Sequence, residues 1–366
     1  MSRFVPLPLL YFLPASASPQ GVGVLAQLLR ALPRNRWSPV VFSLASKEAN
    51  AILEKEAPLC TLGQKSSIDT FSSSRRRFSL SPLFIYQKRL RELAPAIVHN
   101  WETTPDFTML PYLWAGKRHQ QQKGMHFVYS RPYLNNKASW IEKKLGEALL
   151  PLPTELPPPA GEPSGLLEKS SPEYGRLKKE LTDELGLPTD AYLAVAGGPL
   201  VASRKLKDLI WMVDLLEAFY EKFHLVIFGN GPQKWRLDHF RRQVHVADRV
   251  HFVDNPFLLQ KYLPVSSAYL VSDEKEPLNS WLLTAMACKV PVIAAKSSEL
   301  EKQFQVDDNI LFFTPADRAG IARQLWPLLE NPDFAEPLVE NAKNLVEQKY
   351  TLDLMRSKYT ELYSRF

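Results

Sequence analysis

The chain has 366 residues, more than one ordinary hydrophobic core accommodates, and this length fits two domains. Hydrophobic residues make up 45% and charged residues 23%, which is the composition of a soluble globular protein. No segment approaches the ~20 apolar residues of a membrane span, so the sequence predicts no transmembrane helix.

Charge is unevenly distributed along the chain, whose net charge is +6. Residues 1–150 contain 20 basic and 9 acidic side chains, whereas the remainder contains 25 and 30. A basic first part suits an anionic partner, such as a membrane surface, a phosphate-bearing substrate or nucleic acid, and a solvated face explains it equally well. Its densest cluster, Arg75-Arg76-Arg77, has no interleaved aromatic residues. The cluster therefore argues against a nucleic acid partner and fits an anionic membrane or a lipid-linked acceptor better.

The two cysteines, Cys60 and Cys288, are far apart, and neither they nor the seven histidines have metal-ligand spacing. This pattern predicts reduced cysteines in a reducing compartment, and we expect neither a metal nor a cofactor.

The N-terminus has two interpretations. Arg3, the apolar run 4–13 and Ala15-Ser16-Ala17 resemble a secretory signal peptide with its cleavage site. The same run contains Pro6 and Pro8 and leads into a glycine-rich turn, as a first strand does. The second interpretation predicts a cytoplasmic protein, peripheral at the inner membrane face.

The first 150 residues alternate strand-like and helix-like segments, an order that produces a parallel sheet with right-handed crossovers. A turn over 20–23 is expected to follow the first strand. The expected strands are 4–13, 39–44, 96–99 and 126–130, and the expected helices are 24–32, 49–56, 83–93 and 106–114.

Residues 150–165 contain six prolines, which exclude a helix or a central strand. We therefore expect a proline-rich linker over 151–171, between an N-terminal domain (1–150) and a C-terminal domain (172–366). The C-terminal part again alternates and predicts a second doubly wound domain. Its expected strands are 191–196, 224–228, 249–253, 268–271, 291–295 and 309–313, and its expected helices are 172–185, 206–219, 281–288, 319–330, 333–348 and 352–363.

Three loops of the second domain follow strands, where ligands of open parallel sheets collect. They are Gly197-Gly198-Pro199 with the cations Arg204-Lys205, the turn Gly229-Asn230-Gly231, and the segment 272–279. Glycines let the backbone approach a phosphate, cations neutralise it, and a helix N-terminus favours an anion. Taken singly, each loop is also typical of an ordinary turn.

Taken together, the segments resemble one known family. Residues 225–232 (LVIFGNGP), 248–252 (DRVHF), 285–294 (AMACKVPVIA) and 309–315 (NILFFTP) are similar in order and spacing to motifs of the family-4 retaining glycosyltransferases, also called glycosyl transferases group 1. The resemblance covers nearly all of 190–366 and is weaker before it. It implies a GT-B fold, with two Rossmann-like doubly wound parallel-sheet domains facing a cleft, and a last helix that packs back on the N-terminal domain.

The resemblance also implies a reaction. A nucleoside diphosphate sugar lies in the cleft, an acceptor hydroxyl (of a glycan, a lipid or a small molecule) attacks with retention, and an Arg and a Lys stabilise the leaving diphosphate. Glu276 falls where the family has its catalytic Glu beside the sugar, and Asn279 follows it in the same turn.

Other family positions are altered. Thr284 replaces a second Glu that holds the ribose, and Pro199 replaces the Arg. Arg204, with Lys205 beside it, stands at the Lys position, and Gly198, Gly229 and Asn230 complete the expected donor site. In the first domain, Gly21 and Gly23 stand where a glycine loop meets the diphosphate. Two hypotheses stay open: a working glycosyltransferase of the hexosyltransferase type, serving a cell envelope polysaccharide, or a catalytically weakened relative with a binding or assembly role.

Overall fold

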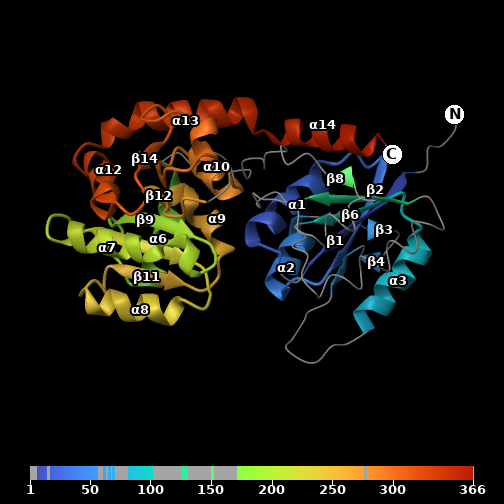
Figure 1. Ribbon diagram of the computed structural model, residues 1–366, viewed down its shortest axis with the longest axis horizontal. Coiled ribbons are helices and arrows are strands. Elements are labelled where there is room, and N and C mark those ends of the chain that lie inside the picture. Colours follow the sequence, from blue (N-terminus) through green and yellow to red (C-terminus); the bar gives the residue numbers. More distant parts are fainter. Residues whose placement is uncertain are drawn as a thin grey trace. The chain divides into compact units, whose positions relative to one another are not determined.

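The structure is a computed structural model in which residues 6–14, 17–56, 61–62, 65–66, 68–70, 81–101, 125–130, 150–151, 171–275 and 278–365 are described. The chain forms two compact units (Figure 1). Unit 1 comprises residues 1–158 and 352–366, and unit 2 comprises residues 159–351. The expected helix over 106–114 and the cluster Arg75-Arg76-Arg77 lie outside the described residues.

Unit 1 contains a parallel sheet of six strands in the order β5-β2-β1-β6-β7-β8. The strands are β1 (Leu7–Leu13), β2 (Trp37–Ser43), β5 (Ile68–Thr70), β6 (Ile97–Trp101), β7 (His126–Ser130) and β8 (Leu150–Pro151), and β3 (Thr61–Leu62) and β4 (Lys65–Ser66) form a separate antiparallel pair. Pro151, in the segment expected to be a linker, belongs to an edge strand, where a missing N–H is tolerated.

Four helices of unit 1 are described: α1 (Pro19–Ala31), α2 (Lys47–Glu56), α3 (Ser81–Leu93) and α14 (Leu352–Tyr363). Alternation along the strands divides the sheet into two faces. Phe12, Phe42 and Val98 pack with Tyr86 and Leu90 of α3 on one face. On the other face lie Tyr11 and His99, in contact with α14.

The start of α1 differs from the prediction. A turn over 20–23 and a helix from residue 24 are expected, but the helix begins at Pro19, with Ser18 as its N-cap. The Ser18 hydroxyl accepts a hydrogen bond from the Gly21 N–H at 3.0 Å. Serine at the N-cap followed by proline at the first helical position is a strong start signal, and it outweighs the low helix propensity of the two glycines. The prediction of a turn at this place is wrong.

Unit 2 contains a second parallel sheet of six strands, in the order β11-β10-β9-β12-β13-β14. The strands are β9 (Tyr192–Gly197), β10 (Phe223–Phe228), β11 (Val250–Val253), β12 (Ala268–Val271), β13 (Val292–Ala295) and β14 (Leu311–Phe313). The helices are α6 (Pro172–Leu185), α7 (Leu206–Glu217), α8 (Lys234–Gln243), α9 (Leu258–Tyr262), α10 (Ser280–Ala287), α11 (Leu300–Gln303), α12 (Arg318–Glu330) and α13 (Ala335–Lys349), with 3₁₀ turns η2 (Ala202–Arg204), η3 (Leu263–Val265) and η4 (Pro332–Phe334).

Helices cover both faces of this second sheet. One hydrophobic core joins the sheet to α6, α9, α10 and α13, and the other joins it to α7, α8 and α12. The chain passes from β9 to its neighbour β10 on one side, while β12 lies on the other side of β9. This reversal is the topological switch point at which doubly wound sheets bind ligands.

Candidate functional site

The carboxyl ends of β9 and β10 are held together through two glycine-containing loops. The Gly198 N–H donates to the Phe228 carbonyl oxygen at 3.0 Å, and Gly198 has φ +128°, a conformation that L side chains rarely adopt. A methyl group added at Gly229 would lie 1.9 Å from the Gly198 carbonyl oxygen. The structure therefore brings Gly198 and Gly229 together. The close packing requires glycine at 229, and the positive φ favours glycine at 198, whatever binds above them.

The turn after β10 is built in the same way. The side-chain oxygen of Asn230 accepts a hydrogen bond from the Gly231 N–H at 2.7 Å, and the Asn230 carbonyl accepts one from the Leu200 N–H at 3.0 Å. Asn230 is exposed at this edge of the sheet. The turn thus fixes the loop after β9 from the β10 side.

Arg204 reaches back over the end of β9. Its Nη2 atom donates to the Gly197 carbonyl oxygen at 2.7 Å, and its guanidinium carbon would lie 2.7 Å from a methyl group at Gly198. The Ser272 hydroxyl, just after β12, donates to the Arg204 carbonyl oxygen at 2.6 Å. The guanidinium is therefore placed at the switch point between β9 and β12.

Lys205 adopts the left-handed conformation (φ 49°) and caps the N-terminus of α7. Its ammonium forms a 2.9 Å ion pair with Glu274, in the loop after β12. The hydrogen bond and the charge of Lys205 lower the pKa of Glu274. Two adjacent cations thus lie at the start of α7, and one of them is held by a carboxylate that an anionic ligand would have to displace.

Asn279 and Thr284, which were expected to hold the donor, instead direct their side chains to the backbone of α10. Asn279 is its N-cap, is fully buried, and accepts a hydrogen bond from the Leu282 N–H at 2.9 Å. The Thr284 hydroxyl, also buried, donates to the Ser280 carbonyl oxygen at 2.7 Å. Glu276, the expected catalytic residue, lies outside the described residues.

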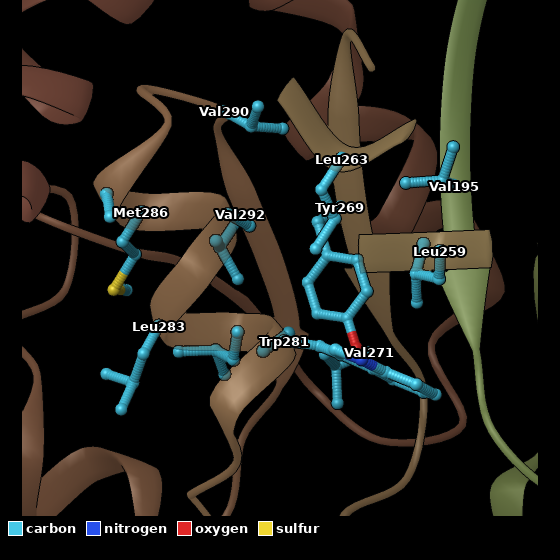
Figure 2. Packing of buried hydrophobic residues seen from close by; sticks show 14 of the residues in the cluster. Val195, Leu259, Leu263, Tyr269, Val271, Trp281, Leu283, Met286, Val290 and Val292 are labelled. Atoms are coloured by element: carbon cyan, nitrogen blue, oxygen red, sulfur yellow. The ribbon is translucent and has the colours of Figure 1, made fainter. Parts of the chain in front are cut away.

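Sequence reasoning missed the apolar side chains that press against the end of β9. A methyl group at Gly197 would lie 2.2 Å from Leu259 and 3.0 Å from Trp281. Figure 2 shows Trp281 packed with Val271 and Tyr269 in this core. The signal that was available is the large aromatic residue in the first turn of α10, directly beside a predicted ligand loop.

In unit 1, Gly21 and Gly23 lie in the first two turns of α1, which follows β1. The Gly21 carbonyl oxygen accepts a hydrogen bond from the Trp101 indole N–H, at the carboxyl end of β6, at 2.9 Å. Gly21 is buried and Gly23 is partly buried. The two glycines therefore belong to a helix N-terminus next to the switch point between β1 and β6, which remains a suitable place for an anion.

In the described part of the chain, no helix has the length and apolar character needed to cross a bilayer. Among the same residues, no three His, Cys, Asp or Glu side chains are grouped so that they would hold a metal ion.

Comparisons with known proteins show what the C-terminal part of the chain is similar to. Residues 178–345 match the family model "Glycosyl transferases group 1". The chain is 27% identical over 139 residues to an N-acetyl-alpha-D-glucosaminyl L-malate synthase of Bacillus anthracis, covering 38% of this chain and 36% of that protein. It is 22% identical over 182 residues to the lipopolysaccharide core biosynthesis glycosyltransferase LpsD of Rhizobium meliloti (strain 1021), covering 50% and 52%. The matches thus span about half or less of the length of these curated relatives.

Solved structures with a similar fold align with nearly all of the chain. The structure of Anabaena HepE in complex with UDP-glucose has a TM-score of 0.71 at 14% identity and covers 98% of this chain and 100% of its own. The glycosyltransferase WaaG, which is involved in lipopolysaccharide biosynthesis, has a TM-score of 0.64 at 11% identity, with 96% and 98% covered. The predicted GT-B class, with two Rossmann-like α/β units, is confirmed.

Proposed function

We propose that the protein is a retaining glycosyltransferase using a nucleoside diphosphate sugar, because residues 178–345 match the family model "Glycosyl transferases group 1". The anomeric carbon forms a bond to the acceptor hydroxyl oxygen while its bond to the diphosphate breaks. The hydroxyl proton passes to solvent, and the diphosphate leaves with the electron pair of the broken bond. Stabilising the charge that develops on this leaving group is the main electrostatic task of the site.

The observation that carries the proposal is the position of Arg204 and Lys205 at the switch point, beside the backbone of Gly198 and Gly229. Two adjacent cations at a helix N-terminus suit a diphosphate. The proposal assigns charge neutralisation to these residues rather than to a metal or cofactor. Glu276 is proposed to act beside the transferred sugar, and Gly21 and Gly23 to approach the diphosphate from unit 1.

The acceptor and the location of the protein are proposed more broadly. Relatives named for lipopolysaccharide core biosynthesis support an acceptor that belongs to a cell envelope polysaccharide, either free or lipid-linked. Such an acceptor is compatible with a cytoplasmic protein that works at the inner face of the membrane. The uneven charge of the chain, with its basic first 150 residues, supports contact with an anionic surface.

A panel of nucleoside diphosphate sugars and acceptors, analysed by mass spectrometry with and without EDTA, tests the proposal. Transfer or donor hydrolysis is expected, is expected to persist in EDTA, and is expected to fall in Lys205→Ala. Lys179→Ala is the matched control because Lys179 is an exposed lysine on α6. The absence of any turnover across the panel would contradict the proposal.

A catalytically weakened relative with a binding or assembly role is the second candidate. The observation that favours it is the inward hydrogen bond of the buried Thr284 hydroxyl to Ser280, which offers no carboxylate to a ribose diol. Calorimetric titration with nucleoside diphosphates separates the candidates further. This second candidate predicts weak or absent binding and no turnover, and turnover that disappears in Glu276→Ala would eliminate it.

A further inference from the structure

Helix α8 has an exposed face that carries basic and aromatic side chains and no acidic one. Its exposed positions follow helical spacing and are Trp235, Arg236, His239, Arg242 and Gln243. Trp235 is 65% exposed, which is unusual for tryptophan. The acidic residue of α8, Asp238, is turned aside into ion pairs with Arg241 and Arg242, each at 2.7 Å.

The face continues onto neighbouring helices as alternating cations and rings. Lys207 Nζ, in α7, lies 4.1 Å from the ring centroid of Phe240, which follows Arg236 by four residues on α8. Phe240 stacks on Trp211 with centroids 5.9 Å apart, and the Arg318 guanidinium lies 5.1 Å from the Trp211 ring. We call Lys207, Trp235, Arg236 and Phe240 the α8 face. It lies at the β11 edge of unit 2 (Figure 1).

The charge of the α8 face is not neutralised. Within the described residues, neither Lys207 nor Arg236 has a carboxylate partner. Each lies over an aromatic ring, Arg236 at 5.2 Å from the Trp235 centroid. A cation–π contact leaves N–H donors of the cation available for a second, anionic partner.

The arrangement of the rings selects among anionic partners. Phe240 is stacked on Trp211, and cations lie over both of these rings. Neither ring therefore offers an open stacking platform for bases, which single-stranded nucleic acids require in series. What remains is one exposed indole flanked by cations. This is the composition that favours the headgroup layer of an anionic bilayer, where tryptophan lies at the interface and Lys or Arg neutralises phosphate.

We propose that the α8 face binds an anionic lipid surface. The contact is peripheral: Trp235 enters the headgroup layer, while Arg236 and Lys207 bind lipid phosphates. The α8 face belongs to unit 2 and contains none of the residues of the basic cluster Arg75-Arg76-Arg77. It does not depend on sugar transfer, so binding is measured without donor or acceptor.

The full chain is sedimented with vesicles of phosphatidylcholine, with and without phosphatidylglycerol, over a salt series. Wild-type protein is expected to bind only the anionic vesicles and to dissociate as salt increases. Each cation removed should weaken partitioning about fivefold, so the Lys207→Gln/Arg236→Gln double variant should lose roughly 25-fold. Trp235→Ala should also weaken partitioning.

Matched controls remove the same groups elsewhere in unit 2. Phe219→Ala removes an aromatic side chain of similar exposure, 67%, and Lys179→Gln removes an exposed lysine of α6. Both are expected to bind as wild type does. Equal binding by wild type and the α8 variants, equal binding to neutral vesicles, or binding of single-stranded DNA in place of vesicles would each overturn the proposal.

Discussion

The hydroxyl groups of Tyr363, in α14, and Tyr11, in β1, are hydrogen-bonded at 2.9 Å although 352 positions separate them in the sequence. The Tyr363 hydroxyl oxygen also lies 2.6 Å from His99 Nδ1. All three side chains are fully buried, and burial lowers the pKa of His99 to about 3, so its imidazole is neutral. A neutral polar network, surrounded by aromatic rings, therefore attaches α14 to the sheet of unit 1.

Tyr363→Phe should destabilise unit 1. The substitution keeps the ring but removes the hydroxyl that contacts both Tyr11 and His99, and losing a buried polar contact typically costs about 1–3 kcal/mol. Hydrogen exchange of the β1 and α14 amides, together with urea unfolding, measures the loss. Tyr359→Phe is the control, because Tyr359 packs against the same His99 ring. Equal losses in the two variants would show that the hydrogen bonds are not responsible.

Gly229→Ala should prevent the loops after β9 and β10 from packing. Its methyl group would lie 1.9 Å from the Gly198 carbonyl oxygen, which is backbone and cannot move independently. We expect a loss of several kcal/mol, about 3 or more by analogy with other overpacked sites, and loss of nucleoside diphosphate binding. Thermal unfolding and calorimetry measure the two effects.

Gly175→Ala is the opposite case and serves as the control for Gly229→Ala. Gly175 lies in α6, and a methyl group there meets nothing within 4 Å. Alanine should therefore stabilise the helix by roughly 0.5–1 kcal/mol. If Gly175→Ala destabilised the protein as much as Gly229→Ala, close contact could not explain either result.

A histidine pair should make unit 2 sensitive to acid. His224 Nδ1, in β10, lies 3.3 Å from His251 Nε2, in β11. Burial, helped by nearby positive charge, lowers the pKa of both, that of His251 to about 4 from an ordinary 6.5. Below pH 6.5 the unfolded chain therefore binds more protons than the folded one. The contribution of this pair to the free energy of unfolding should fall as the pH drops from about 6.5 towards 4 and level off below that.

Urea unfolding followed across this pH range tests the role of the pair. The His224→Gln/His251→Gln variant should show a flatter dependence between pH 6.5 and 4. The dependence does not vanish, because His99 titrates in the same direction. An unchanged slope in the double variant would contradict the assignment.

Glu274→Gln should strengthen the binding of nucleoside diphosphates. The change removes the carboxylate that is 2.9 Å from Lys205, so an incoming diphosphate no longer competes for that ammonium. The stability change should be small, because the pair is partly exposed. Asp190→Asn is the control, because it removes the exposed Asp190–Lys222 pair at the opposite, amino-terminal edge of the sheet. A several-fold lower Kd in Glu274→Gln alone is expected; equal affinity in both variants would contradict the role of Lys205.

The elements of unit 2 were predictable from the sequence because hydrophobic periodicity and turn residues agree there. The predicted α6 and β12 have the observed bounds, and so does the predicted α14 of unit 1. The start of α1 was not predictable, because the helix start signal of Ser18 and Pro19 outweighs the glycines that suggested a turn. The roles of Asn279 and Thr284 illustrate a deeper limit. Their types suit a ligand, but only three-dimensional structure shows that α10 uses both side chains for its own hydrogen bonds.

One face of the sheet of unit 1 is covered by α14, which comes from the far end of the chain, and this has a consequence for biosynthesis. At typical translation speeds, Tyr363 is made roughly 20–70 s after Tyr11. During that interval residues 159–351, which are contiguous, can fold as they emerge from the ribosome. The nascent chain meanwhile presents Tyr11, Trp37 and His99 without their C-terminal partner. Chaperones that recognise uncovered aromatic surface would therefore have their longest opportunity at the first strand to be made.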